Sequence, residues 1–232
     1  MLKILLDYIF PFRCSACSNL IESGHGICGD CWLKFKFISK PYCKVCCKKF
    51  EVNLGFTGLC GKCTVKRPKL DMIRSLLEFS NETKGLIHNF KYNDKTILGK
   101  FFADLIHKRF HEDFDDVDII APVPMHKFRR IFRNYNPPQI LAHELSRLMS
   151  RPVVPELLIK TRVTKNQVGL NKTQRAKNLL GSFTLNKKFD IKNKVILLVD
   201  DVLTTGATSS ECAKILKQSH VAKVKLVTIA KV

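Results

Sequence analysis

Four Cys-x-x-Cys pairs lie in the first 63 of the 232 residues and leave this part of the chain few ways to fold. Each pair puts two sulfurs on one short turn, and two such pairs complete the tetrahedral set that Zn²⁺ prefers. Structural zinc is worth about 10 to 16 kcal/mol of apparent folding free energy in small peptides, so this segment can fold around metal. Four thiolates per ion leave no open position, which predicts two structural zinc ions. The predicted ligands are Cys14, Cys17, Cys28, Cys31, Cys43, Cys46, Cys60 and Cys63.

The way these pairs combine is left open by the spacing. Consecutive pairing joins the first pair to the second and the third to the fourth, whereas a cross-brace interleaves the same eight sulfurs. Cys47 could replace its neighbour Cys46 as a ligand. We interpret Cys47 and the distant Cys212 instead as buried or spare thiols.

The chain is strongly basic, with 40 Lys+Arg against 20 Asp+Glu and a formal net charge of +20. Such a surface suits a phosphate-rich ligand or a nucleic acid. The apolar start, residues 1–12, carries Asp7 and lacks a small-residue cleavage site, which favours a short helix or lead-in over a signal peptide. No apolar run approaches the length of a membrane span. We therefore expect a cytoplasmic protein, whose reduced thiols bind metal.

A division into two parts is predicted: a cysteine-rich double zinc-ribbon module at 1–68 and an α/β domain at 69–232. Apolar strands alternate with helices in the second part, which indicates a parallel sheet flanked by helices on both faces. Residues 160–172 are poor in core residues and predict a long mobile loop. Strands are expected at 73–79, 117–123, 194–199 and 223–232, and helices at 81–93, 94–113, 137–150 and 208–218.

A pair of acids ends the most apolar strand, and "TTGATSS" follows as the start of a helix. Ligands of open α/β sheets bind beyond the carboxyl ends of the strands, where Asp200 and Asp201 stand. Backbone N–H groups and the hydroxyls of Thr204, Thr205 and Thr208 can surround an anion, and a glycine between them lets the main chain approach it. The pattern predicts a sugar-phosphate site, with the acids on ribose hydroxyls or magnesium and the turn on the 5′-phosphate.

Other sites that use similar residues fit less well. The chain has neither the G-x-x-x-x-G-K-[ST] of a P-loop nor the G-x-G-x-x-G of a dinucleotide site. A phosphoacceptor receiver domain would carry the acidic pair on its first strand, but only 31 residues follow Asp201. The plainest alternative is an acidic pair that merely caps the helix.

The stretch at 195–208 resembles the phosphoribosyl pyrophosphate (PRPP) motif of type I phosphoribosyltransferases. Nearly the whole chain resembles the ComF (ComFC) competence protein family, which joins a cysteine-rich zinc module to a phosphoribosyltransferase domain. The segments that carry this resemblance are "CSAC…CGDC…CKVC…CGKC", "LIHNFKY", "APVPMH" and "NQVGLNKTQRAKNLLGSF". It implies a type I phosphoribosyltransferase-like fold, two zinc ions, and Mg²⁺ bound together with PRPP.

The resemblance also implies roles for single residues. Asp200 and Asp201 would be the catalytic acids on the ribose hydroxyls and Mg²⁺. In "RNYNPPQ" the chain departs from the family's "R-G-F-N-Q", with Asn134 for Gly and Pro137 for Gln. The implied PRPP contacts are the acids, the 5′-phosphate turn, the pyrophosphate side and the closing loop: Asp200, Asp201, Val202, Leu203, Thr204, Thr205, Gly206, Ala207, Thr208, Pro124, His126, Gln167 and Arg175.

The predicted function is a PRPP- and Mg²⁺-binding protein that acts in DNA uptake for natural transformation. Single-stranded DNA and other competence proteins, such as the DNA-uptake helicase, are the expected partners. "KFRRIFRNY" at 127–135 interleaves basic residues with rings, as single-strand binding requires, although an amphipathic helix laid on the sheet gives the same pattern. The alternative function is a nucleotide-salvage phosphoribosyltransferase, for which no pocket for a particular base is recognisable.

Overall fold

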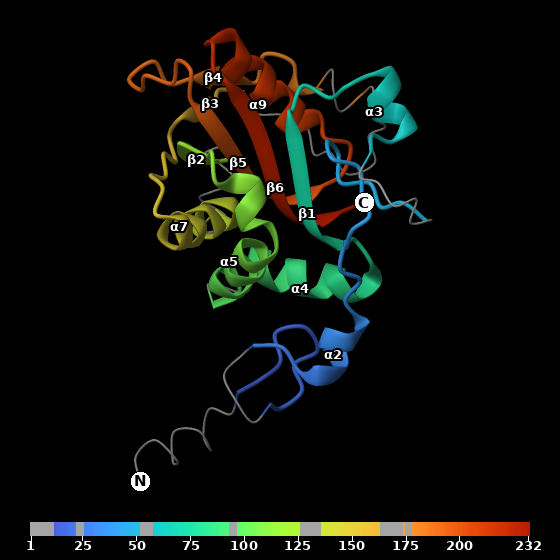
Figure 1. Cartoon of the computed structure of the whole chain (residues 1–232). Helices are drawn as coiled ribbons and strands as arrows, with labels where there is room; N and C mark the ends of the chain where they lie inside the picture. The colour runs from blue at the N-terminus through green and yellow to red at the C-terminus, as the bar shows by residue number, and fades with distance from the viewer. Residues whose placement is uncertain are drawn as a thin grey trace.

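Four parallel strands in the order β1-β6-β5-β2 form the central sheet (Figure 1). A computed structural model of the chain describes residues 12–21, 26–51, 58–92, 97–125, 136–162, 174 and 178–232. The parallel α/β fold predicted from the alternating pattern is confirmed. Its strands are β1 (Met72–Glu78), β2 (Ile119–Pro122), β5 (Val195–Leu203) and β6 (Lys223–Lys231).

The two faces of the sheet are covered by different elements. In strand β5, the side chains of each face are buried in a different cluster. Val195, Leu197 and Val199 belong to one cluster, and Ile196 and Leu198 belong to the other. Successive side chains of a strand point to opposite faces, so a continuous apolar run needs cover on both sides. The first face is covered by α4 (Asn81–Tyr92), α5 (Ile97–Phe110), the 3-10 turn η1 (His111–Phe114) and α7 (Pro137–Met149), and the second by α9 (Ala207–Gln218).

A second, two-stranded sheet was not predicted. Strands β3 (Leu158–Lys160) and β4 (Phe183–Leu185) pair antiparallel and pack beside α9. Three residues are too few to show a strand period, and the two segments lie far apart in the sequence, so no local pattern reveals the pairing. Most of the loop predicted at 160–172 lies outside the described residues.

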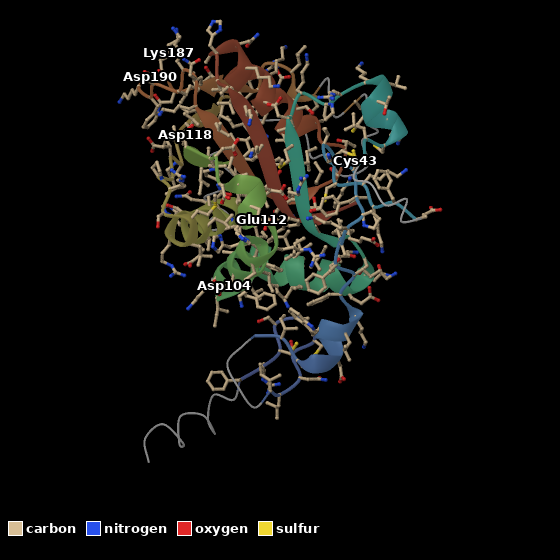
Figure 2. The ribbon with its side chains drawn as sticks, in the orientation of Figure 1. Cys43, Asp104, Glu112, Asp118, Lys187 and Asp190 are labelled. Atoms are coloured by element: carbon tan, nitrogen blue, oxygen red, sulfur yellow. The ribbon has the colours of Figure 1, made fainter. Side chains whose placement is uncertain are left out.

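The later part of the cysteine-rich segment lies along the edge of the central sheet, whereas its first part lies beside α4 and α5 (Figure 1). The segment contains two short helices, α2 (Gly29–Lys34) and α3 (Gly61–Val65), and Cys43 lies beside β1 (Figure 2). The Ile38 N–H donates to the Leu76 carbonyl at 3.0 Å, and the Ile73 N–H donates to the Val45 carbonyl at 2.7 Å. These bonds use backbone groups that an uncovered edge strand would leave unpaired.

The same segment contributes to the main apolar core. Phe35, Ile38 and Tyr42 belong to one buried cluster with Leu76 and Leu77 of β1. Burying apolar side chains is the main favourable term in folding, so this part of the cysteine-rich segment is stabilised by the sheet as well as by its own sulfurs.

Candidate functional site

The eight predicted zinc ligands form two clusters, each with all four sulfurs within 4.8 Å of one another. The first contains Cys14, Cys17, Cys28 and Cys31, and the second contains Cys43, Cys46, Cys60 and Cys63. Consecutive pairs are therefore brought together, which resolves the pairing that the spacing left open. Cys47 belongs to neither set and is buried in the core.

The chemistry of both clusters fits zinc. The Cys28 N–H donates to Cys14 Sγ and the Cys60 N–H donates to Cys43 Sγ, each at 3.3 Å. Burial raises the pKa of Cys14 and Cys43, but backbone N–H donors outweigh it and lower the pKa of each thiol to about 6. Desolvation and the neighbouring thiols raise the pKa of Cys31. Four sulfurs this close become anionic together only around a cation, as a structural zinc site requires.

A cavity of about 420 Å³ opens at the carboxyl ends of the strands. From the predicted PRPP set, Pro124 and all nine residues of 200–208 line it. His126, Gln167 and Arg175 lie outside the described residues. Its remaining lining residues are Phe79, Lys91, Val123, Met125, Asn136, Pro138, Lys160, Ser209 and Val232.

The acidic pair lies within β5, which continues to Leu203, and both carboxylates line the cavity. The Asp201 N–H donates to Asp200 Oδ1 at 2.9 Å. The Asp201 carboxylate also forms an ion pair, because Lys91 Nζ lies 2.9 Å from Asp201 Oδ2. Desolvation and the charge of Asp201 raise the pKa of Asp200 to about 8, although the Asp201 N–H and Lys91 act against this rise. Two close carboxylates that resist ionisation together are suited to a shared cation or to hydroxyl donors.

Asp200→Asn is expected to gain stability over the wild type as pH rises. The ordinary pKa of Asp200 is 3.8 and the folded value is about 8, so in this range the folded protein keeps a proton that the unfolded chain releases. That carboxyl therefore lowers the stability of the wild type progressively from about pH 4 to pH 8, by up to about 1.4 kcal/mol per pH unit, and Asn does not. Denaturant unfolding of both proteins at about pH 5.5 and 8.5 measures how this stability difference changes with pH. A stability difference that stays constant between the two pH values would contradict the raised pKa.

The turn after β5 contains a glycine with a left-handed backbone conformation. Gly206 has φ +71° and precedes the first residue of α9, Ala207. Only a residue without Cβ adopts this φ readily. The hydroxyls of Thr204, Thr205 and Thr208 line the cavity beside the N-terminus of this 12-residue helix. Helix N-terminal N–H groups and hydroxyls together form a suitable surface for a phosphate.

The described cavity lining includes polar residues that were not predicted, among them Lys91, Asn136 and Lys160. Lys91 lies in the quoted segment "LIHNFKY", but its ion pair spans 110 residues of sequence and has no local signal. Asn136 precedes α7, is 9% exposed, and its Oδ1 is buried with no hydrogen-bond partner in the described structure. An unsatisfied buried acceptor is costly, so this oxygen is suited to accept from a ligand or water.

Among the described helices, none combines the length and the apolar composition needed to cross a membrane.

Comparison with known proteins identifies both parts of the chain. Residues 5–64 match the double zinc ribbon domain, and residues 139–232 match the phosphoribosyl transferase domain. Competence protein F of Haemophilus influenzae is 30% identical over 96% of this chain and 98% of its own. DNA utilization protein YhgH of Escherichia coli is 25% identical over 92% of this chain and 87% of its own. A purine phosphoribosyltransferase structure from Pyrococcus horikoshii aligns with 56% of this chain and 80% of its own, at 16% identity and a TM-score of 0.36.

Proposed function

The chain belongs to the competence protein F family, and on that basis we propose that it binds PRPP with Mg²⁺ in the strand-end cavity and acts in DNA uptake. The observation that carries the PRPP proposal is the meeting of the acidic pair and the hydroxyl-rich turn in one cavity. The DNA role is supported by the names of two relatives, a competence protein and a DNA utilization protein.

Different residues of the cavity would bind different parts of PRPP. The turn at 204–208 and the start of α9 would hold the 5′-phosphate, because N–H groups and hydroxyls donate to its oxygens. Asp200 and Asp201 would accept from the ribose hydroxyls and hold Mg²⁺, which prefers oxygen ligands. Bound Mg²⁺ would neutralise charge on the pyrophosphate. Such positioning and charge stabilisation are what transfer of the phosphoribosyl group requires.

Turnover is tested by incubating the purified protein with labelled PRPP and Mg²⁺, and with either free nucleobases or short single-stranded DNA. Release of pyrophosphate that depends on DNA would support a role in handling incoming strands. Release that depends on a free base would favour the nucleotide-salvage alternative. If PRPP binds and neither acceptor causes release, the cavity binds PRPP without transferring its phosphoribosyl group to these acceptors. Absence of PRPP binding would refute the proposal.

Single-stranded DNA is proposed as a second ligand, and its affinity is expected to fall at least about ten-fold between roughly 50 and 200 mM salt. The net charge of +20 supports this, because each phosphate contact releases counterions, with a slope of about −0.7 per contact for single strands. Fluorescence anisotropy with a labelled oligonucleotide measures the slope. Replacing Arg129, Arg130 and Arg133 by Ala should make it shallower. An affinity that does not change with salt would remove this ligand from the proposal.

A further inference from the structure

Lys91 places a positive charge in the cavity wall. It lies in the last turn of α4, its Nζ is 2.9 Å from Asp201 Oδ2, and the two side chains are 24% and 14% exposed. A cation is favourable at a helix C-terminus, and the flexible four-carbon stem lets the ammonium change partners. The ion pair therefore occupies a carboxylate oxygen that Mg²⁺ would also use.

The two lysines among the described cavity residues come from elements that pack on different faces of the sheet. Asp201 pairs with Lys91 of α4, one of the helices that cover the first face of the sheet. Lys160 belongs to β3, which packs in the region of α9, and its Nζ lies 5.5 Å from the centre of the Phe183 ring. The turn that precedes α9 is the proposed place of the 5′-phosphate. Lys91 approaches the ligand from the opposite face.

We propose that Lys91 binds the pyrophosphate group of PRPP. The inference rests on the proposed PRPP site, in which the ribose hydroxyls lie on the acidic pair and the 5′-phosphate lies at α9. A divalent cation at Asp201 repels the neighbouring ammonium by Coulomb's law. Among the described cavity residues, only the uncharged Pro124 has been assigned to the pyrophosphate at C1′. We infer that the ammonium moves from Asp201 to the pyrophosphate oxygens and leaves the carboxylate to the metal. Lys91 is then a substrate-contacting residue, and its ion pair offsets part of the repulsion between the two acids in the ligand-free protein.

The test uses fragments of the ligand. Calorimetry with Mg²⁺ present measures the binding of pyrophosphate, ribose 5-phosphate and PRPP to the wild type and to Lys91→Met. The variant is expected to bind pyrophosphate and PRPP at least about ten-fold more weakly and ribose 5-phosphate within about two-fold of the wild type, since a charge-assisted contact is lost only with the first two. Lys91→Arg, which keeps the charge, should retain most of the pyrophosphate affinity.

Lys217→Met is the matched control. Lys217 Nζ also lies 2.9 Å from a carboxylate, that of Asp71, but both side chains are more than a third exposed and neither lines the cavity. This variant should bind all three ligands as the wild type does. A Lys91→Met protein that loses ribose 5-phosphate affinity equally would show that Lys91 only positions Asp201, and one that keeps pyrophosphate affinity would show no contact. Either result overturns the inference. A wild type that binds none of the ligands overturns the proposed function itself.

Discussion

Replacing Asp200 and Asp201 together by Asn is expected to abolish Mg²⁺-dependent PRPP binding, with a loss of at least about a hundred-fold, while the protein stays folded. Asn keeps the shape but replaces one acceptor oxygen of each carboxylate by a donor and removes the charges that attract a hard cation. Close carboxylates oppose each other's ionisation in the ligand-free protein, so relief of this opposition offsets the loss of the Lys91–Asp201 ion pair at neutral pH. Titration calorimetry with and without Mg²⁺ measures the loss, and thermal unfolding confirms the fold.

Asp190→Asn serves as the control for this double variant. Asp190 is exposed and lies away from the cavity, near the margin of the molecule in Figure 2. It should bind PRPP as the wild type does. If the double variant bound PRPP with unchanged affinity, the acidic pair would not be the ribose and metal site, and the cavity would need another ligand.

Cys43→Ser is expected to destabilise the whole protein, by several kcal/mol, and to remove PRPP binding as well as one zinc ion. The loop between Cys43 and Cys46 is tied to the α/β domain by three carbonyls: Lys44 accepts from Arg74 Nη1 at 2.9 Å, Val45 from the Ile73 N–H at 2.7 Å, and Cys46 from Lys231 Nζ at 2.7 Å. Loss of a structural zinc is comparable in size with the total stability of a domain.

The effect should reach the cavity through both anchored strands. Arg74 of β1 is 4% exposed and pairs with Asp113 at 2.7 Å. Releasing the Lys44 carbonyl leaves Arg74 Nη1 with one of two acceptors, the Ile73 carbonyl, and so weakens the hydrogen bonding of a buried cation. Lys231 ends β6 and precedes Val232, which lines the cavity. The disturbance caused by Cys43→Ser thus begins at the sheet edge and continues to the ligand site.

Cys14→Ser is the matched variant in the first cluster. The described contacts of that cluster's surroundings are with helices: Asn89 of α4 donates to the Ser15 carbonyl, and the ring of Trp32 lies 6.2 Å from that of Phe101 in α5. Cys14→Ser should therefore lower the melting temperature less than Cys43→Ser does, and it should leave PRPP binding in place. The comparison measures the metal content, melting temperature and PRPP affinity of both variants. Equal effects of Cys14→Ser and Cys43→Ser on PRPP binding would contradict the proposed role of the 43–46 loop.

Local sequence patterns predicted those parts of the fold and site that depend on neighbouring residues. The apolar run of β5, the acids that follow it and the glycine in the turn before α9 each have a signature within a few residues. The cysteine spacing likewise predicted the eight clustered sulfurs but not their grouping. The division of the chain at 68/69 and the roles given to the cavity residues remain predictions.

Contacts between distant segments could not be predicted in the same way. The Lys91–Asp201 ion pair, the β3-β4 pairing and the anchoring of the 44–46 carbonyls each join residues that only the folded chain brings together. Asn136 shows another limit, because an unsatisfied oxygen is recognised only once its surroundings are known. Propensity and periodicity contain no information about such partners.

The position of the cysteine-rich segment on β1 has a consequence for the chain before it acquires metal. Without that cover, the outer N–H and carbonyl groups of β1 form a ready template for a strand from another molecule. Zinc shortage would then cause self-association of newly made copies, so the metal protects the solubility of this protein in addition to its shape.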